Sequence, residues 1–341
     1  MTLTFTLCSN NYLAQAITLG NSLIFHNPAG KFVIGLVDRK NSSIDYSVVP
    51  YEIIEVEDIG IFDFKELYLK YNITELNTAV KPFYFHYFFS TRSDISNVVY
   101  LDPDILVYSP LNEVEEELKG SEIIITPHFT TPLDDDKLQT EEDFLNSGLY
   151  NLGFIAIKNS PEGNRMVNWW AGRLRNKAFI DLKRGLFTDQ IWINFVPLFF
   201  KNVKILNHPG YNLAYWNLHE RMLSEYAGEY LVNEKYLLVF YHFSGFNPLI
   251  PEILSKYQNR YTFEGRPDVL KLFSEYSEQL LSNGFKTYII YPNKFSIIKD
   301  QADEKYLSER KKEVPFINRV LRRIILIIIS KFKIIMDYSS L

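Results

Sequence analysis

The sequence contains one cysteine, no glycine- or proline-rich segment and no excess of basic residues. Cys8 alone can form neither an intramolecular disulfide nor a cysteine-rich zinc site. The net charge of -5, from 36 basic and 41 acidic residues, differs from the basic composition of proteins that bind nucleic acids, so no nucleic-acid partner is expected. Hydrophobic residues make up 47% of the chain and charged residues 23%, which excludes wholesale disorder and collagen-like repeats.

The sequence also lacks a signal peptide and a membrane-spanning run. Residues 1–8 lead into polar Ser9, Asn10 and Asn11, with no basic segment and no long apolar run before them. The longest uninterrupted apolar run near the end of the chain, residues 324–329, is far shorter than the roughly 20 residues that a spanning helix needs. We therefore expect the protein in the cytoplasm.

The end of the chain differs from the rest in charge. Residues 311–341 hold seven Lys or Arg and two acids, a net charge of +5, so the first 310 residues carry -10. Residues 315–336 are strongly apolar with basic residues between, which predicts a basic amphipathic tail over 313–341 that contacts an anionic membrane surface through 313–336. The alternative is a helix packed on the body of the protein or on a second subunit, so an oligomer is compatible with the sequence.

Short apolar segments alternate with helical patterns along the first part of the chain. Strands are expected over residues 2–8, 31–38, 97–102 and 121–127, with helices between them over 12–25, 62–71 and 79–90. This alternation predicts an α/β fold with a mainly parallel sheet flanked by helices, in which ligands bind at the carboxyl ends of the strands. Later segments are expected as helices over 166–176, 189–199 and 267–283, and as a last strand over 286–291.

Two aspartates separated by one residue follow the strand expected over 97–102. In an extended segment, residues i and i+2 point to the same side, so Asp102 and Asp104 can converge on one ion. Paired hard oxygen ligands suit Mg²⁺ or Mn²⁺, which leave coordination positions for substrate phosphates. The alternative is a solvated Asp-Pro-Asp turn, but the place of the pair directly after a buried strand favours the metal site.

A second motif follows the apolar strand near residue 240. The neutral imidazole of His242 suits a third metal ligand, and Ser244 with the backbone of Gly245 suits a phosphate. The alternative is a buried histidine with a hydrogen-bonded partner. Together with the aspartate pair, the metal interpretation is the stronger one.

Two further motifs carry polar groups at expected element ends. Asp189 and Gln190 open the helix expected over 189–199 after Thr188 as its N-cap, and they face the carboxyl edge of the sheet; helix capping alone is the alternative. Asn151 and Gly153 lead into a strand, where amides can hydrogen-bond sugar hydroxyls, and a glycine-bearing turn without a ligand is an equal alternative. The polar stretch 128–146 has two interpretations of equal weight, a functional loop and a surface insertion.

The order of these motifs, Asp102-X-Asp104, Asn151-X-Gly153, Asp189-Gln190 and His242-X-Ser244-Gly245, resembles that of nucleotide-sugar-dependent glycosyltransferases of the GT-A fold. The resemblance covers about residues 2–248 and is greatest to the retaining family 8 group, which includes glycogenin and bacterial lipooligosaccharide galactosyltransferases. It implies a GT-A catalytic domain over 1–265 and a helical extension over 266–312. It also implies a bacterial enzyme of polysaccharide biosynthesis at the inner face of the cell membrane.

The resemblance assigns roles to individual residues. It implies retaining transfer of a hexose from a UDP-sugar to a glycan, glycolipid or protein acceptor, with Mn²⁺ or Mg²⁺ bound by Asp102, Asp104 and His242. The residues implied near the base and ribose are Cys8, Asn10, Tyr12 and Asp38, of which Tyr12 can stack on the base. Those implied near the diphosphate are Lys81, Ser244 and Gly245. Those implied along the donor sugar are Asn151, Asp189 and Gln190, and the last two would support its cationic face.

The sequence departs from the family's pattern in three places. Pro103 stands where a small residue such as Ala is common. Phe246-Asn247-Pro248 replaces a Lys-Pro pair, so one expected phosphate contact is missing. Residues 207–221 have no obvious counterpart in the family. They contain side chains suited to line a binding site for the donor or acceptor sugar: Tyr211, Asn212, Tyr215, Trp216 and His219. For Trp216, packing in the core is at least as good an explanation.

Two other functions share some of these features. A sugar-nucleotide nucleotidyltransferase has a similar sheet and acid pair, but it normally begins with a glycine-rich phosphate loop, and residues 8–16 contain no glycine. A non-catalytic sugar-binding or scaffold protein would have a degenerate metal site. Metal-dependent binding of UDP distinguishes a transferase from the scaffold.

Overall fold

The computed structural model describes residues 1–313 of the chain, with side chains to residue 310. Contacts divide the chain into two units, of which the first, Met1–Phe295, holds the whole central sheet. The second unit begins at Ser296 and is described to the end of helix α12, Lys294–Glu313. The tail predicted over 313–341 lies, from residue 314 on, outside the described residues.

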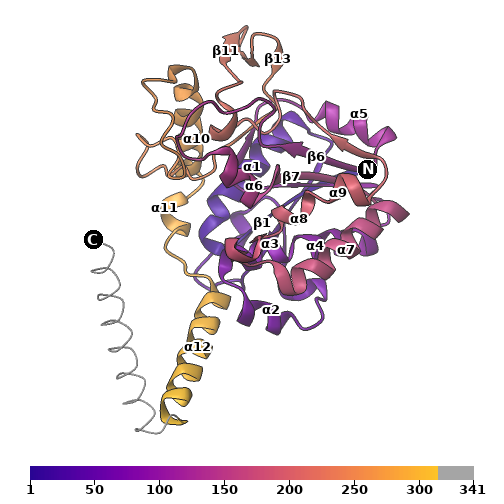
Figure 1. Cartoon of the computed structure of the whole chain (residues 1–341), viewed down its shortest axis with the longest axis vertical. Helices are drawn as coiled ribbons and strands as arrows, with labels where there is room; N and C mark the ends of the chain where they lie inside the picture. The colour runs from indigo at the N-terminus through magenta and orange to yellow at the C-terminus, as the bar shows by residue number, and fades with distance from the viewer. Residues whose placement is uncertain (314–341) are drawn as a thin grey trace, which may run out of the picture. The chain divides into compact units, whose positions relative to one another are not determined.

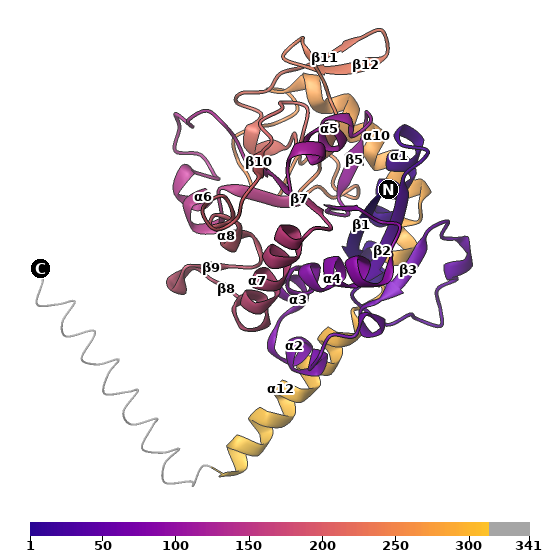
Figure 2. The ribbon, with the colours of Figure 1, turned by 90° about the vertical axis from the view of Figure 1, so that its right-hand side faces the viewer.

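The first unit is built on a seven-stranded sheet in the order β10-β6-β7-β4-β1-β2-β3 (Figures 1 and 2). Neighbouring strands run parallel except at β7, which is antiparallel to both β4 and β6. The mainly parallel order confirms the predicted α/β fold. The strands are β1 (Thr2–Cys8), β2 (Lys31–Leu36), β3 (Glu52–Glu55), β4 (Asn97–Leu101), β6 (Ile123–Pro127), β7 (Tyr150–Lys158) and β10 (Val203–Ile205).

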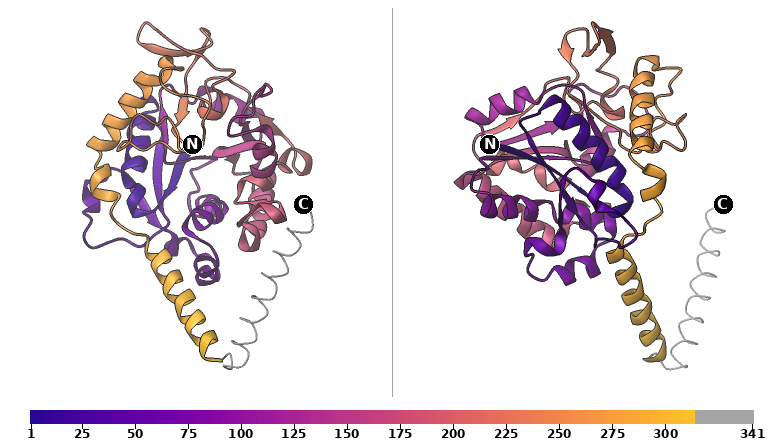
Figure 3. Two further views of the ribbon diagram at one scale, coloured as in Figure 1. Left: turned by 60° about the vertical axis from the view of Figure 1, so that its left-hand side comes forward. Right: turned by 180° about the vertical axis from the view of Figure 1, so that it is seen from behind.

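Helices cover both faces of this sheet because its strands alternate apolar side chains to either side. On one face, Phe5 of β1 packs with Phe85 and Phe88 of α4. On the other face, Phe32 of β2 approaches α1 so closely that a Cβ on Gly20 would lie 2.7 Å from its ring. Figure 3 shows α1 lying across the sheet. These helices are α1 (Leu13–His26) and α4 (Lys81–Thr91), with α7 (Pro161–Lys177) packed beside α4.

The remaining helices are short or lie at the margins of the sheet. Within residues 1–313, no helix combines the length and the apolar character that crossing a bilayer requires. The remaining helices of the first unit are α2 (Phe64–Lys70), α3 (Ile73–Ala79), α5 (Asn112–Gly120), α6 (Glu141–Ser147), α8 (Gln190–Ile193), α9 (Val196–Phe199), α10 (Leu270–Ser282) and α11 (Phe285–Tyr288).

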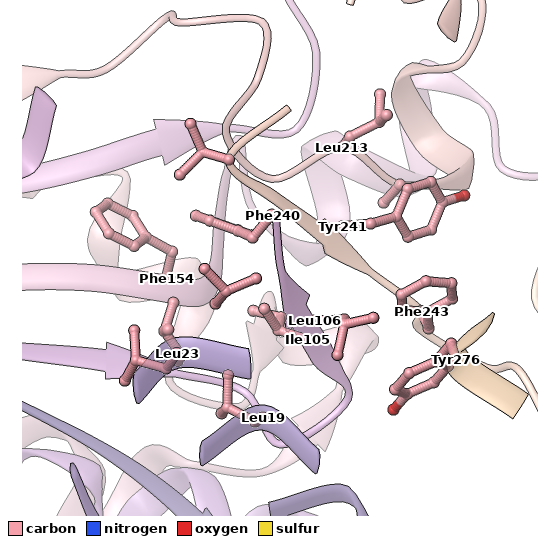
Figure 4. Packing of buried hydrophobic residues seen from close by; sticks show 14 of the residues in the cluster. Leu19, Leu23, Ile105, Leu106, Phe154, Leu213, Phe240, Tyr241, Phe243 and Tyr276 are labelled. Atoms are coloured by element: carbon pink, nitrogen blue, oxygen red, sulfur yellow. The ribbon is translucent and has the colours of Figure 1, made fainter. Parts of the chain in front are cut away.

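A separate two-stranded sheet joins a segment directly after β4 to a segment much later in the chain. Strand β5 (Ile105–Val107) pairs antiparallel with β14 (Phe240–His242), between α1 and α10. Phe243 stacks on Tyr276 of α10 with ring centroids 3.9 Å apart, and Figure 4 shows this aromatic packing beside Leu106 and Tyr241. The helices predicted as an extension from residue 266 thus include two, α10 and α11, that contact α1 within the first unit.

Smaller strands form the edges of the unit. They are β8 (Ile180–Asp181) paired with β9 (Leu186–Phe187), and the three-stranded sheet of β11 (Leu223–Tyr226), β12 (Glu229–Val232) and β13 (Tyr236–Leu237).

Two predicted elements differ from the structure. Residues 286–291 were expected as a strand, but the chain forms helix α11 after Gly284, whose φ of 86° is left-handed. Phe285 and Tyr288, three residues apart, are both buried, which is the period of a helix and not of a strand. The single helix expected over 189–199 is two short helices, α8 and α9, and Pro197 in the first turn of α9 offers no N–H to continue α8.

Candidate active site

A cleft of about 630 Å³ opens at the carboxyl end of β4 and is lined by all four motifs. The lining includes Asp102 and Asp104, Asn151 and Gly153, Asp189 and Gln190, and His242 and Ser244. These side chains come from segments up to 142 residues apart in sequence, from Asp102 to Ser244. Asp102 follows the carboxyl end of β4, and Asn151 lies at the start of β7, which is antiparallel to β4 and therefore begins at the same edge of the sheet. The pairing of β5 with β14 brings His242 to this edge as well.

Asp102, Asp104 and His242 form a compact ligand set. One ligand atom from each lies within 4.8 Å of the others, with 3.0 Å between His242 Nε2 and Asp104 Oδ1 and 3.8 Å between His242 Nε2 and Asp102 Oδ2. The pairing of β5 with β14 places His242 opposite Ile105, directly after the second aspartate. Two carboxylates and one imidazole are a donor set that fits Mn²⁺ or Mg²⁺.

The electrostatics of this set indicate a place for a cation. Burial acts to lower the pKa of His242, but the negative charges of Asp104 and Asp102 outweigh it and raise the pKa above its usual value. Burial raises the pKa of Asp102, although Lys81 and His242 oppose the shift. The Tyr100 hydroxyl donates to Asp102 Oδ1 at 2.6 Å, which leaves Oδ2 toward His242.

A chain of hydrogen bonds behind His242 fixes which ring nitrogen faces the carboxylates. Nδ1 lies 3.4 Å from Asn212 Oδ1, and because an amide oxygen only accepts, Nδ1 donates. Asn212 Nδ2 donates to Asn151 Oδ1 at 3.2 Å, and Asn151 Nδ2 lies 3.2 Å from His128 Nε2. With Nδ1 protonated in this way, the lone pair of a neutral His242 is on Nε2, toward the aspartates.

Gly153 is required by the close approach of His242. A Cβ at this position would lie 2.5 Å from His242 Cε1 and 2.7 Å from Asn151 Oδ1. The carbonyl of Gly153 also accepts from the backbone N–H of Asp102 at 2.8 Å. The Asn151-X-Gly153 motif therefore serves the ligand set directly, by leaving space for the imidazole ring.

Lys81 and Asp189 form a buried ion pair in the cleft wall. Their side chains are 2.7 Å apart and only 2% and 3% exposed. Lys81 Nζ also donates to the carbonyl of Leu152 at 2.9 Å and lies 4.1 Å from the centroid of the Tyr100 ring. Asp189 follows Thr188, whose φ of 47° is unusual for a β-branched residue, so local backbone strain accompanies the placement of this carboxylate.

Gln190 is held firmly by the backbone around it. Its Oε1 accepts from the N–H of Leu152 at 3.1 Å, and its Nε2 donates to the carbonyl of Ser147 at 2.9 Å. A Cβ at Gly148 would lie 3.0 Å from Gln190 Cγ, so the Gln190 side chain packs closely against the backbone of Gly148. Gln190 thus joins α6, β7 and α8 in one wall of the cleft.

The residues predicted near the base and ribose lie away from this lining, after β1 and β2. Asp38 is fully buried and accepts from the side chain of Asn10 and from the N–H groups of Arg39 and Lys294. Cys8 is buried as well. Tyr12 is 42% exposed, and burial and the charge of Asp104 raise its pKa to about 12.

The remaining predicted residues divide between the cleft and the core. Ser244 lines the cleft, and Gly245, with a φ of 78°, makes a turn in which a Cβ would lie 2.6 Å from Ser255 Oγ. Tyr215 and Trp216 line the cleft, and Trp216 is buried and packs edge-on against His242. Tyr211 is fully buried, and His219 contacts the backbone of Thr131.

Two residues of the site carried no motif in the sequence. His128 is buried in the cleft between Trp216 and Asn151, and Tyr257 closes the same cleft from a loop beyond residue 248. Each is placed by contacts with residues far away in sequence, so no local pattern identifies it. The stretch 128–146, predicted as a loop, contains helix α6 and contributes Gln139, Phe144 and His128 to the lining.

No family model matches the chain. Two uncharacterized proteins of Bacillus subtilis strain 168 are each 24% identical to it: YfnF over 252 residues, 71% of this chain and 80% of YfnF, and YfnD over 246 residues, 71% of this chain and 76% of YfnD.

Several solved structures similar to the chain are glycosyltransferases. The galactosyltransferase LgtC, in complex with donor and acceptor sugar analogues, is 15% identical, with 82% of this chain and 95% of LgtC covered and a TM-score of 0.49. GlyE of Streptococcus pneumoniae TIGR4 is 17% identical, with 86% of this chain and 65% of GlyE covered and a TM-score of 0.46.

Proposed function

We propose that this protein is a metal-dependent glycosyltransferase that moves a hexose from a UDP-sugar to a hydroxyl of a glycan, glycolipid or protein acceptor, with retention. The observation that carries the proposal is the convergence of Asp102, Asp104 and His242 at one end of a cleft whose wall holds Lys81, Asp189 and Gln190. A cation ligand set beside a buried lysine suits a diphosphate leaving group, and buried amides suit sugar hydroxyls.

In this proposal each group of side chains has its own task. Asp102 and Asp104 through oxygen and His242 through Nε2 would hold the cation, which when bound neutralises charge on the departing diphosphate. Lys81 would keep positive charge near the same phosphates, and Ser244 would donate to them. Gln190 and Asn151 would orient the donor sugar.

The Lys81–Asp189 pair bears on stereochemistry. Because Asp189 is buried and paired with Lys81 at 2.7 Å, it is poorly suited to act as a free carboxylate nucleophile. Its charge can instead support the cationic character of the sugar at the transition state. Retention would then proceed by attack on the same face as the leaving diphosphate, without a covalent intermediate on this residue.

The proposal is tested by titrating UDP into the full chain with and without Mn²⁺, and by assaying hydrolysis of nucleotide sugars with NMR detection of the released anomer. We expect UDP binding that depends on Mn²⁺ and a donor that is hydrolysed with retention. Asp104→Ala should abolish both. Asp94→Ala, at an exposed aspartate paired with Lys31 away from the cleft, is the matched control and should leave both intact.

The same experiments distinguish the proposed function from the two alternative functions. Activity of Asp104→Ala in the presence of chelator would refute the metal site, and absence of UDP binding in any condition would favour a scaffold. A nucleotidyltransferase would release pyrophosphate from a nucleoside triphosphate. The turn after β1 that would hold this triphosphate is a short 3₁₀ helix, Asn10–Tyr12, without a glycine.

A further inference from the structure

An aromatic and basic surface lies on helices α7, α8 and α9, which are neighbours in Figure 1. We call it the α7–α9 patch. Its apolar members include three strongly exposed side chains, Phe195 at 42%, Leu198 at 78% and Phe199 at 48%. Its full membership is Trp169, Trp192, Phe195, Leu198 and Phe199, with the cations Arg165, Arg173, Lys177 and Lys201.

The apolar members form one continuous surface. Phe195 and Phe199 stack with centroids 5.1 Å apart, and Phe199 packs edge-on against Trp169 at 5.8 Å. Trp192 donates from Nε1 to the carbonyl of Lys177 at 3.1 Å, which ties α8 to the end of α7. Exposed aromatic rings held in fixed positions by one another need no rearrangement before they bind a surface.

Cations surround these rings. The Arg173 guanidinium lies 6.0 Å from the ring of Trp169 and 5.9 Å from that of Trp192, and the Lys177 ammonium lies 5.6 Å from Trp192. Residues 161–204 hold eight Lys or Arg and three acids. Of these acids, Asp189 is buried against Lys81 and Glu162 is bound by Arg165. The segment is therefore basic on a body whose first 310 residues carry -10.

We propose that the α7–α9 patch docks the protein on a bilayer that contains anionic phospholipid. The aromatic and leucine side chains would enter the headgroup region, where Trp is favoured, while Arg and Lys contact lipid phosphates. The proposal does not depend on the transfer reaction, because lipid binding is measured without a substrate.

The charge of the patch argues against a second copy of the chain as its occupant. A two-fold dimer through this surface would bring the same cations of both copies together, with Arg173 and Lys177 near their counterparts. Like charges at short range are unfavourable unless acids intervene, and the exposed acids here are few. An anionic surface meets the same cations with the opposite sign.

The position of α8 gives this docking a consequence. Gln190, at the start of the helix, lines the cleft, whereas Trp192, two residues later, belongs to the patch. A membrane bound at the patch would thus lie beside one wall of the cleft. An acceptor carried on a lipid could be reached from there.

Tryptophan fluorescence tests the patch separately from the tail. The chain has four tryptophans, of which Trp170 and Trp216 are buried, and none lies after residue 216. Full chain is mixed with phosphatidylglycerol and phosphatidylcholine vesicles whose acyl chains carry bromine near the headgroup. We expect bromine to quench part of the emission, and a Trp169→Phe, Trp192→Phe variant to lose that quenching while still binding.

A second pair of variants measures the apolar contribution. Phe195→Ser with Leu198→Ser should weaken binding to anionic vesicles by about tenfold or more, since two exposed apolar side chains would no longer enter the bilayer. Phe25→Ser, at a side chain on α1 that is more exposed (81%) than either of these, should leave the binding unchanged. Vesicle binding without any quenching would overturn the proposal. It would also be overturned if Leu198→Ser left vesicle binding unchanged and instead converted a dimer to a monomer in sedimentation, because the patch would then be a dimer interface.

Discussion

The ring of His242 reaches the two aspartates because one neighbour leaves space for it and another accepts a hydrogen bond from it. Gly153 leaves the space, since a Cβ there would lie 2.5 Å from the imidazole, and Asn212 provides the acceptor for Nδ1. Asn212 can occupy its place because an asparagine tolerates its φ of 56° better than most residues. The position of one metal ligand therefore depends on residues that supply no ligand atom themselves.

Asn212 gives a direct prediction about metal binding. Asn212→Gly removes the acceptor without backbone strain at this φ, and it should lower Mn²⁺ affinity by roughly 10- to 100-fold, the usual effect of losing a partner of a ligating histidine. Asn212→Asp keeps an acceptor for Nδ1 of His242 but loses the donor to Asn151 Oδ1, so its affinity should fall by less than that of Asn212→Gly. Titration calorimetry with Mn²⁺ measures both, and equal affinities for the two variants would contradict the positioning role.

His128 predicts how stability depends on pH. Burial lowers its pKa to about 3, so it is neutral when folded, whereas an unfolded histidine has a pKa of about 6.5. Stability from this group is complete above pH 6.5 and falls as the pH drops toward 3, because only the unfolded chain takes up the proton. Between pH 7 and pH 5 the loss is about 2 kcal/mol.

This dependence is measured by urea unfolding of wild type and His128→Gln at both pH values. The glutamine keeps an acceptor for Asn151 but does not titrate. The wild type should lose about 2 kcal/mol more between pH 7 and pH 5 than the variant. Parallel losses in both proteins would show that His128 is not the titrating group.

Among the helices, α3 links a local capping signal to the cleft. Asn72 accepts from the N–H of Glu75, and Glu75 accepts in return from the N–H of Asn72, a complete capping box. The other oxygen of Glu75 accepts from the N–H of Ile180, which begins β8 and lines the cleft. The start of one helix thus holds an edge of the site.

Asn72→Ala should therefore lower the free energy of unfolding by about 1 kcal/mol. Asn72→Ser, which keeps a capping oxygen, should lose much less. Thermal or urea unfolding of the two variants provides the measurement. A loss of the same size in both would place the effect in side-chain packing and not in the cap.

Other elements show where local patterns mislead. Residues 286–291 contain enough apolar and β-branched residues to predict a strand. In the structure this segment packs against α1, and a helix allows both Phe285 and Tyr288 to be buried. The strands 2–8 and 97–102 were predicted well because each is buried on both faces and consists largely of apolar and β-branched residues, which favour strands.

Over the whole chain, charge is divided by region. Residues 161–204 carry +5 and residues 311–341 carry +5, so the rest of the chain carries -15 against a total of -5. If the α7–α9 patch and the tail both contact anionic lipid, the protein has two weak anchors, and stable membrane binding usually takes two. The tail's part of this expectation comes from the sequence alone.

Truncation after Lys312 tests the second anchor. Removal of 313–341 should move the protein from the vesicle pellet largely into the supernatant. Salt at 0.5 M, which shortens the electrostatic screening length to roughly 4 Å, should also release the full chain from the vesicles. Quenching by brominated lipid should persist at high vesicle concentration, because the patch is intact. Unchanged pelleting of the truncated chain would remove the tail from membrane binding.

The candidate ligand set was predictable because its chemistry is local. Asp102 and Asp104 are two residues apart after a buried strand, and His242 follows another apolar segment, so pattern and spacing alone identified all three. The roles of Asn10 and Asp38 were less accessible. Whether a polar residue at a strand end faces a ligand or its neighbours depends on distant partners, here Tyr46, Arg39 and Lys294.

Sequence alone established the α/β class, the order of the motifs and the charge of the tail, because hydrophobic period, spacing and charge are properties of neighbouring residues. Folding established that Gly153 makes room for His242, that Asn212 and His128 align it, and that Lys81 pairs with Asp189. It also gathered residues from α7, α8 and α9 into one basic aromatic surface. These features arise from contacts between residues far apart in the chain, and only packing in three dimensions selects them.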